Sequence, residues 1–273
     1  MSRRLVLAVV FSLVPGLALA AVIGSAQSVT KEVNGRISGA ERAINPGDQV
    51  VSDEAVRTGA GSATRLKFLD DTEITIGAGS TIVLDKFVFN PDKTAQSTVI
   101  KVTKGTFRFV TGQSSPENFT LQTGVATIGI RGTDVTIVCD SAGQCSVVVT
   151  SGNVLVCPKI QRGLDGRTIA QFCPEAVKLD KTNNFTTVSS GGKTTGAQQV
   201  SPAAVSSLNN AVASGQPGIT TSGLSNQATG GNAPAPGTPA GQNANDQTGK
   251  SDPQTFVLTP VTGGGTGSGP VSQ

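Results

Sequence analysis

The side chains that could do chemistry in this chain are few, and the most versatile of them is missing. The 273 residues contain no histidine, no tyrosine and no tryptophan. Histidine is the usual general base near neutral pH and the commonest side chain that binds transition metals. An enzyme built on this sequence would have to use carboxylates, lysine or a bound cofactor. We therefore predict no catalytic residue, no metal site and no cofactor.

Four aspartates, Asp70, Asp71, Asp85 and Asp134, remain as candidates for acid–base or cation chemistry. Two facing carboxylates would suit glycoside hydrolysis, and an oxygen-rich cluster would suit calcium. Most of these aspartates stand in strings that are typical of turns, where aspartate is common for conformational reasons. We interpret them as turn residues and solvated charges. A carboxylate-based glycan hydrolase or lyase stays as an alternative function.

The first residues carry the pattern of an export signal. Two arginines precede an apolar run from Leu5 to Ala20, which ends in an Ala-Leu-Ala triplet. This arrangement predicts a secretory signal peptide over residues 1–20, with the mature chain beginning at Ala21. A second cleavage site follows Ala26, and an uncleaved membrane anchor is the alternative. After cleavage we expect no transmembrane span, and a location in the periplasm, at the cell surface or outside the cell.

Four cysteines, Cys139, Cys145, Cys157 and Cys173, are the other reactive side chains. An even number of cysteines in an exported chain predicts disulfides. The first two flank a five-residue segment that we expect to be a hairpin loop, so we predict the pairs Cys139–Cys145 and Cys157–Cys173. A zinc site is the rival interpretation. It is disfavoured because neither pair has the usual short zinc spacing and histidine is absent.

The charges do not indicate a nucleic-acid partner. The net charge is +3, and two of the cations belong to the export signal. Basic and acidic residues are interspersed between Lys31 and Arg108, so no basic stripe forms, and neither tyrosine nor tryptophan is available for base stacking. We predict that the protein does not bind nucleic acid.

Short runs of β-branched or alternating residues, separated by turn residues, extend over residues 29–188. Examples are Glu73–Ile76, Thr81–Phe89 and Asn153–Cys157. No sustained helical period interrupts them, so the pattern predicts an all-β domain, either a stacked β-roll (solenoid-like) or a two-sheet sandwich. Residues 21–28 are expected to be a linker.

Residues 189–273 differ in composition and are rich in Gly, Ser, Thr, Asn, Gln, Ala and Pro. Such a segment buries too little apolar area to offset its ordering entropy, so we predict a mostly disordered tail that the β domain does not need for folding. One island differs. Ser201 and Pro202 are typical of a helix start, and they precede a helical pattern through Ala213 with Val205 and Leu208 on one face.

A series of short strings gives the β region a recognisable order. In chain order they are Val56-Arg57-Thr58-Gly59, Leu66-Lys67-Phe68-Leu69-Asp70-Asp71-Thr72, Lys104-Gly105-Thr106-Phe107-Arg108-Phe109, Ile128-Gly129-Ile130-Arg131-Gly132-Thr133 and Ser151-Gly152-Asn153-Val154. In order and spacing they resemble the FecR domain family over about residues 46–157. One departure is Asp71, where the family usually has glycine, so this loop is expected to use a different turn type.

The resemblance implies an envelope sensing or interaction module rather than an enzyme. In family members that regulate sigma factors, a cytoplasmic segment and a transmembrane helix precede the domain. Here four residues precede the apolar run, so we expect no direct contact with a cytoplasmic sigma factor. We predict a binding module for an envelope protein or polysaccharide. An accessory that signals through a separate membrane protein is a further alternative.

The segment Arg131-Gly132-Thr133 is the candidate binding site. Arginine presents a planar fork of donors that matches a carboxylate. We expect Arg131 to donate to carbonyl oxygens at a turn of its own chain, and the alternative role is to hold a carboxylate of the partner.

Overall fold

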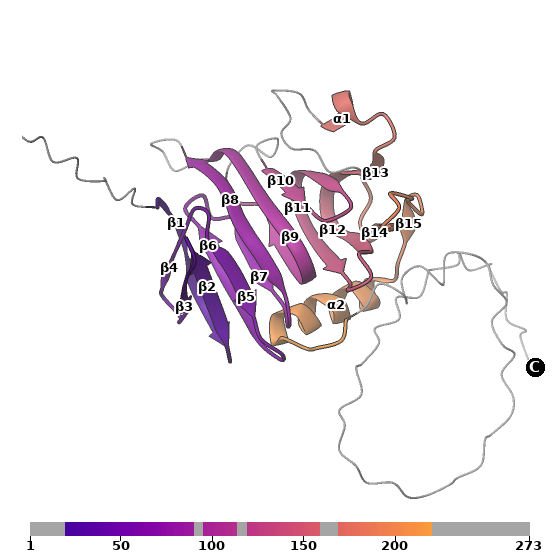
Figure 1. The fold of residues 1–273 in the computed structure, drawn as a ribbon. Coiled ribbons are helices and arrows are strands. Elements are labelled where there is room, and N and C mark those ends of the chain that lie inside the picture. Colours follow the sequence, from indigo (N-terminus) through magenta and orange to yellow (C-terminus); the bar gives the residue numbers. More distant parts are fainter. Residues whose placement is uncertain (1–19, 90–94, 114–118, 159–168, 220–273) are drawn as a thin grey trace, which may run out of the picture.

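The described residues form a β-sheet structure with two helices (Figure 1). A computed structural model describes residues 20–89, 95–113, 119–158 and 169–219. Fifteen strands within these residues are hydrogen-bonded into one sheet. The predicted all-β class is confirmed. The pairing pattern shows how this one sheet is folded into two layers.

The first layer has a ladder that runs from β4 through β1, β6, β7, β9, β11, β12 and β14 to β15. The strands that belong to this layer alone are β1 (Val22–Thr30), β4 (Gln49–Val51), β6 (Ala63–Phe68), β7 (Glu73–Ile76), β14 (Asn184–Val188) and β15 (Gln198–Gln199). The second layer has a ladder from β3 through β2, β5, β8, β9, β10, β11 and β12 to β13. Its own strands are β2 (Val33–Ile37), β3 (Ala40–Ala43), β5 (Ala55–Thr58), β8 (Thr81–Phe89), β10 (Phe119–Gln122) and β13 (Val177–Leu179).

Three long strands belong to both layers: β9 (Ala95–Val110), β11 (Thr127–Cys139) and β12 (Cys145–Cys157). The first part of β9 pairs with β8 and β10, and its last part pairs with β7 and β11. β11 and β12 pair with each other at both ends and exchange their outer neighbours between the layers. The architecture is therefore a two-layer sandwich whose layers are joined by shared strands.

A single hydrophobic core lies between the layers. Phe109 in the first-layer part of β9 and Phe119 of β10 place their rings edge to face, with centroids 5.5 Å apart. Ile82 and Leu84 of β8 and Ile137 of β11 are fully buried in the same cluster. Each such side chain contributes about 1.5–3 kcal/mol by leaving water, so this core is the main source of stability.

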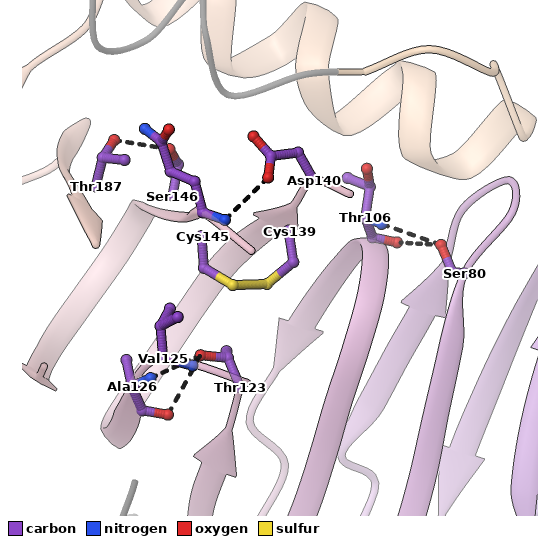
Figure 2. Close-up of a disulfide and its surroundings, with 11 residues drawn as sticks. Ser80, Thr106, Thr123, Val125, Ala126, Cys139, Asp140, Cys145, Ser146 and Thr187 are labelled. Carbon is purple, nitrogen blue, oxygen red and sulfur yellow. Dashed lines mark hydrogen bonds between the residues drawn. A yellow bond between two sulfur atoms is a disulfide. The ribbon is translucent and has the colours of Figure 1, made fainter. Parts of the chain in front are cut away.

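The shared strands change the phase of their side chains at glycine. In β9, Ile100 and Val102 face the core before Gly105, whereas Phe107 and Phe109 face it afterwards. Side chains alternate strictly along a regular strand, so moving from even to odd core positions needs one extra residue. Gly105 supplies it with a φ of +105°. Ser80 packs against this glycine and accepts a hydrogen bond from the Thr106 N–H at 3.0 Å (Figure 2).

The amino-terminal boundary differs from the expectation. Residues 21–28, expected to be a linker, form most of β1, which pairs with both β4 and β6. Ile23 and Ala26 are buried, and these two core positions explain why the segment is ordered as a strand. The sequence of residues 21–28 resembles that of the adjoining export signal, so the strand pattern is not apparent from the residues alone. The predicted signal peptide lies, through residue 19, outside the described residues.

The carboxyl-terminal boundary also differs. The predicted helix is confirmed as α2 (Pro202–Ser214), which Ser201 caps by accepting from the Ala204 N–H at 3.2 Å. The apolar face of α2 packs on the outer side of the first layer, against Val138, Val148 and Phe185. Figure 1 shows α2 lying along one end of the strands, below β9, β11 and β12 in the view. The domain therefore continues past residue 188 to at least the end of α2. Residues 220–273 lie outside the described residues.

Neither α2 nor the single-turn helix α1 (Ile169–Phe172) is long and apolar enough to cross a membrane, and the described part of the chain has no other helix.

Both cysteine pairs lie at disulfide distance, in the pairing that the sequence predicts. Cys139 and Cys145 face each other across the β11–β12 hairpin, where the Asp140 carboxylate accepts from the Gln144 N–H at 2.9 Å (Figure 2). Cys157 at the end of β12 is bonded to Cys173, which directly follows α1. The second bridge fixes α1 to the sheet.

Candidate functional site

The segment Arg131-Gly132-Thr133 lies at the point where β11 passes from the second layer to the first. Before it, residues 127–129 pair with β10, and after it, residues 134–139 pair with β9. The core positions change phase here as well, from Ile128 and Ile130 to Val135 and Ile137. Gly132, with a φ of +58°, supplies the extra residue of this bulge. The motif is first of all a device that keeps β11 in register with both layers.

A matching change occurs directly opposite, in β12. Its core positions change from Val147 and Val149 to Val154 and Val156 across Gly152, which has a φ of +90°. The two glycines are in close contact. A Cβ atom added to Gly152 would lie 2.1 Å from the Gly132 carbonyl oxygen. The two strands therefore bend together, and the string Ser151-Gly152-Asn153 is the structural counterpart of the arginine segment.

Thr133 fastens the bulge to the end of β9. Its N–H donates to the Thr111 hydroxyl at 2.9 Å, and its carbonyl accepts from the Thr111 N–H at 3.0 Å. Its own hydroxyl is buried and has no hydrogen-bond partner among the described residues. Thr133 thus contributes through its backbone and its packing, whereas Thr111 supplies the side-chain hydrogen bond.

The backbone of Arg131 belongs to the paired strands at this bulge, whereas its side chain reaches the surface. Its side chain is exposed, it stands opposite the exposed Asn153, and it makes no hydrogen bond or ion pair with any residue that the structure describes. Two other arginines contrast with it, since Arg42 and Arg108 are each paired with a carboxylate. The expected turn role, donation to carbonyl oxygens, is thus not seen in the described part of the chain.

The family comparison fits this geometry. Residues 54–155 match the family model described as "FecR protein". We call these residues, which make up less than half of the chain, the FecR domain after the family that they match. The match begins next to β5 and ends in β12, so it contains all three layer-changing glycines. Strands β1–β4, β13–β15 and helix α2 lie outside it. The FecR family is regulatory rather than enzymatic and is typically associated with the envelope.

No curated protein matches the chain. Two crystal structures, at 1.65 and 2.50 Å, of a protein from Parabacteroides distasonis ATCC 8503 described as a "putative anti-sigma factor" are similar to it, with TM-scores of 0.40 and 0.41 and 15% identity. Each comparison covers 56% of this chain and 62% of that protein, so less than two thirds of its length is matched.

The carboxylates of the FecR domain that the sequence singled out each have a structural partner. Asp134 pairs with Arg108 through two contacts of 2.9 and 2.6 Å, and this hydrogen bonding raises the pKa of Arg108. Asp85 pairs with Lys101 at 2.9 Å. Asp70 accepts from both the N–H and the hydroxyl of Thr72, at 3.1 and 2.8 Å. The described residues contain no group of three or more acidic or cysteine side chains that could hold a metal ion.

Asp71, the departure from the family pattern, occupies the position that favours glycine. Its φ is +65°, and its N–H donates to the Phe68 carbonyl at 3.1 Å. The Phe68 N–H in turn donates to the Thr72 carbonyl at 2.8 Å. This is a three-residue hairpin with a left-handed third residue, which confirms the expected change from a two-residue turn. The Lys67 Nζ atom lies 2.8 Å from Asp71 Oδ1, and this hydrogen bond raises the pKa of the lysine.

Sequence reasoning missed a second polar feature close to the bulge. An open surface depression with a volume of about 340 Å³ lies where β13, β14 and β15 meet, and Lys181, Asn184 and Gln198 contribute to its lining. No motif marks it, because its residues come from short strands that lie outside the FecR domain. The only local signal is an Asn-Asn pair between two β-prone runs, with a φ of +61° at Asn183.

Proposed function

We propose that the chain is an exported FecR-domain protein of the bacterial envelope, which binds a protein or polysaccharide partner through the surface around Arg131 and catalyses no reaction. The observation that carries the proposal is the contrast between the exposed side chain of Arg131 and its fixed backbone. Its guanidinium is exposed and unpaired within the described residues, yet its backbone is fixed by two coupled bulges. A planar fork on a rigid support is well suited to recognise a carboxylate.

The partners of the carboxylates support a binding role over a hydrolase. A general acid or nucleophile needs a carboxylate that faces the substrate. Asp85 and Asp134 are each in an ion pair, and Asp70 caps its own turn. Turnover of a glycan by the purified protein, abolished by replacing one aspartate, would overturn the non-enzymatic assignment.

Export is part of the proposal, and β1 bears on how the signal is removed. Cleavage before Ala21 leaves β1 intact, whereas cleavage after Ala26 would remove the buried Ile23 and every β1 residue that pairs with β4. We therefore expect a mature chain that begins at Ala21. N-terminal sequencing of the protein from an envelope fraction measures this directly, and recovery of an intact Met1 in membranes would contradict it.

A signalling accessory that acts through a separate membrane protein is the second candidate. The regulatory character of the FecR family favours it. In this case the ligand of Arg131 would be a membrane protein of the envelope.

The test is quantitative capture of partners from envelope extracts with wild type, Arg131→Ala and Arg57→Ala. Arg57 is the matched control, because it is an exposed arginine of the same domain that lies on β5. We expect capture to be lost with Arg131→Ala and kept with Arg57→Ala, while all three proteins melt at the same temperature. An identical set of partners on wild type and Arg131→Ala would refute the proposed surface.

A further inference from the structure

Within the described residues, four strands form the outer edges of the two layers, and three of these edges are charged or covered. The edge of β4 is covered by Arg42 and Glu54, whose side chains are hydrogen-bonded to its backbone at 2.6 and 3.1 Å. β3 carries Glu41 as well as Arg42, and β13 carries Lys178. Charged side chains discourage an edge from pairing with a further strand, so these three edges are protected.

The fourth edge, β15, is neither charged nor covered (Figure 1). Residues 194–219 contain no charged side chain. The Val200 N–H donates to the Asn183 carbonyl at 3.0 Å, so the backbone groups of Val200 point towards β14. Inward and outward residues alternate along an antiparallel strand, so those of Gln199 and Ala197 point away from β14. Both residues are exposed, and no described residue bonds to these outward groups.

The tail beyond the described residues contains one run that suits such an edge. Residues 255–258 read Thr-Phe-Val-Leu and include the only three consecutive apolar residues of positions 220–273. Phe256 is also the only aromatic residue after Phe185. β-branched and aromatic side chains are those that strands favour. No charge follows Asp252, so an uncharged run is available to an uncharged edge.

The connecting segment is long enough to bring this run to β15. Ile219, the last described residue, packs against the apolar cluster that contains Val200, which directly follows β15. Residues 220–254 then lead to the run, and a flexible linker of about 35 residues spans roughly 30–35 Å on average. Such a tether holds the run at an effective concentration of about a millimolar. A short strand that would bind too weakly from solution is therefore favoured within one chain.

We propose that residues 255–258 pair with the outward edge of β15 as a further strand of the first layer. Their backbone groups bond to the outward groups of β15. The exposed Pro202 and Ala203 at the start of α2 adjoin β15 and give apolar side chains of the run a neighbour. The pairing closes an edge that would otherwise be a template for other chains. It does not involve Arg131, so it is independent of the proposed function.

The test is amide hydrogen exchange of the full mature chain, followed residue by residue by NMR. The Gln199 N–H should exchange at least about threefold more slowly in wild type than in Val257→Pro, which corresponds to a run that is paired for about two thirds of the time. Proline has no N–H and does not fit inside a paired strand. Val261→Pro makes the same exchange outside the run and should behave like wild type. The Val200 N–H, bonded within the sheet, should exchange equally in all three proteins.

Equal exchange of the Gln199 N–H in wild type and Val257→Pro overturns the proposal. Protection that grows with protein concentration also overturns it, because the edge would then pair with a second copy instead of its own tail. Protection at Lys178 or Glu41 in place of Gln199 would assign the run to another edge and contradict the choice of β15.

A second pair of variants tests the same contact from the side of the sheet. Gln199→Pro removes an outward N–H, a change that an edge strand tolerates, whereas Gln199→Ala keeps it. The amides of residues 255–258 should exchange faster in Gln199→Pro than in Gln199→Ala. The same exchange rates in these two variants would show that the run does not pair with β15.

Discussion

Replacing Gly152 by alanine should destabilise the FecR domain more than replacing a positive-φ glycine whose added Cβ would meet no other atom. The new Cβ would lie 2.1 Å from the Gly132 carbonyl oxygen and 2.7 Å from the Thr133 methyl group. The neighbours are mainly backbone atoms of the opposing bulge, so no flexible side chain can move aside. We expect about 1–2 kcal/mol from the left-handed backbone and about 1–3 kcal/mol from overpacking.

The summed loss is about 2–5 kcal/mol, a large part of the roughly 5–15 kcal/mol that stabilises a domain. For a domain of about 150–250 residues each kcal/mol lowers the melting temperature by roughly 2–4 °C. Gly152→Ala should therefore melt at least about 4 °C below wild type, and calorimetry or denaturant titration measures the difference.

Gly47→Ala is the matched control. Gly47 has the same φ of +90°, but nothing lies within 4 Å of its added Cβ. The difference between the two variants therefore isolates the contact between the bulges from the backbone strain. Gly132→Ala, with φ +58° and open space, should resemble Gly47→Ala. If Gly152→Ala is no less stable than Gly47→Ala, the two bulges are not coupled and the account of how Arg131 is held is wrong.

Three further predictions concern stability. Thr133→Val should be neutral or slightly stabilising, because the buried Thr133 hydroxyl has no partner among the described residues. Thr58→Val should cost about 1–3 kcal/mol, because the Thr58 hydroxyl donates to one backbone group and accepts from another. Equal urea midpoints of the two variants would contradict this contrast. Arg42→Ala should cost about 3 kcal/mol because it leaves the fully buried Glu54 carboxylate without its cation, and an unchanged denaturation curve would count against it. A chain that ends at Ile219 should melt like the full chain, whereas one that also lacks α2 should melt at a lower temperature, since the helix covers apolar side chains of the first layer; equal melting of the two would show that the packing of α2 adds no stability.

Much of the strand pattern was predictable because burial imposes alternation. The runs Glu73–Ile76 and Thr81–Phe89 coincide with β7 and β8. From the residues alone, Gly105 separates the β-like runs Ser97–Thr103 and Thr106–Thr111, because glycine between such runs is typical of a turn. In the structure the strand continues through this glycine with a change of phase. A phase shift in the alternating pattern on either side of a glycine is thus a signal for a strand shared between layers.

The docking of α2 was not predicted, although the helix itself was. The cap at Ser201 and the apolar face are local features that a sequence displays directly. The surface beneath the helix is made of residues far away in the chain, including Val138 and Val148. One trace of it was visible, since the run Val147-Val148-Val149 is apolar at every position instead of alternating. A continuous apolar run predicts a strand that is buried on both faces and therefore needs a cover.

The candidate site shows why a motif can be found in sequence while its role is not. The glycines of Arg131-Gly132-Thr133 and Ser151-Gly152-Asn153 are required because two neighbouring strands change layer at the same level, a relation between strands that a single run of residues cannot display. The fold thus accounts for the glycines and for the backbone of Thr133. It does not require the guanidinium of Arg131, which makes no hydrogen bond or ion pair with a described residue. A side chain that the fold does not need, at a place where the backbone is held rigid, is the residue whose replacement separates recognition from stability.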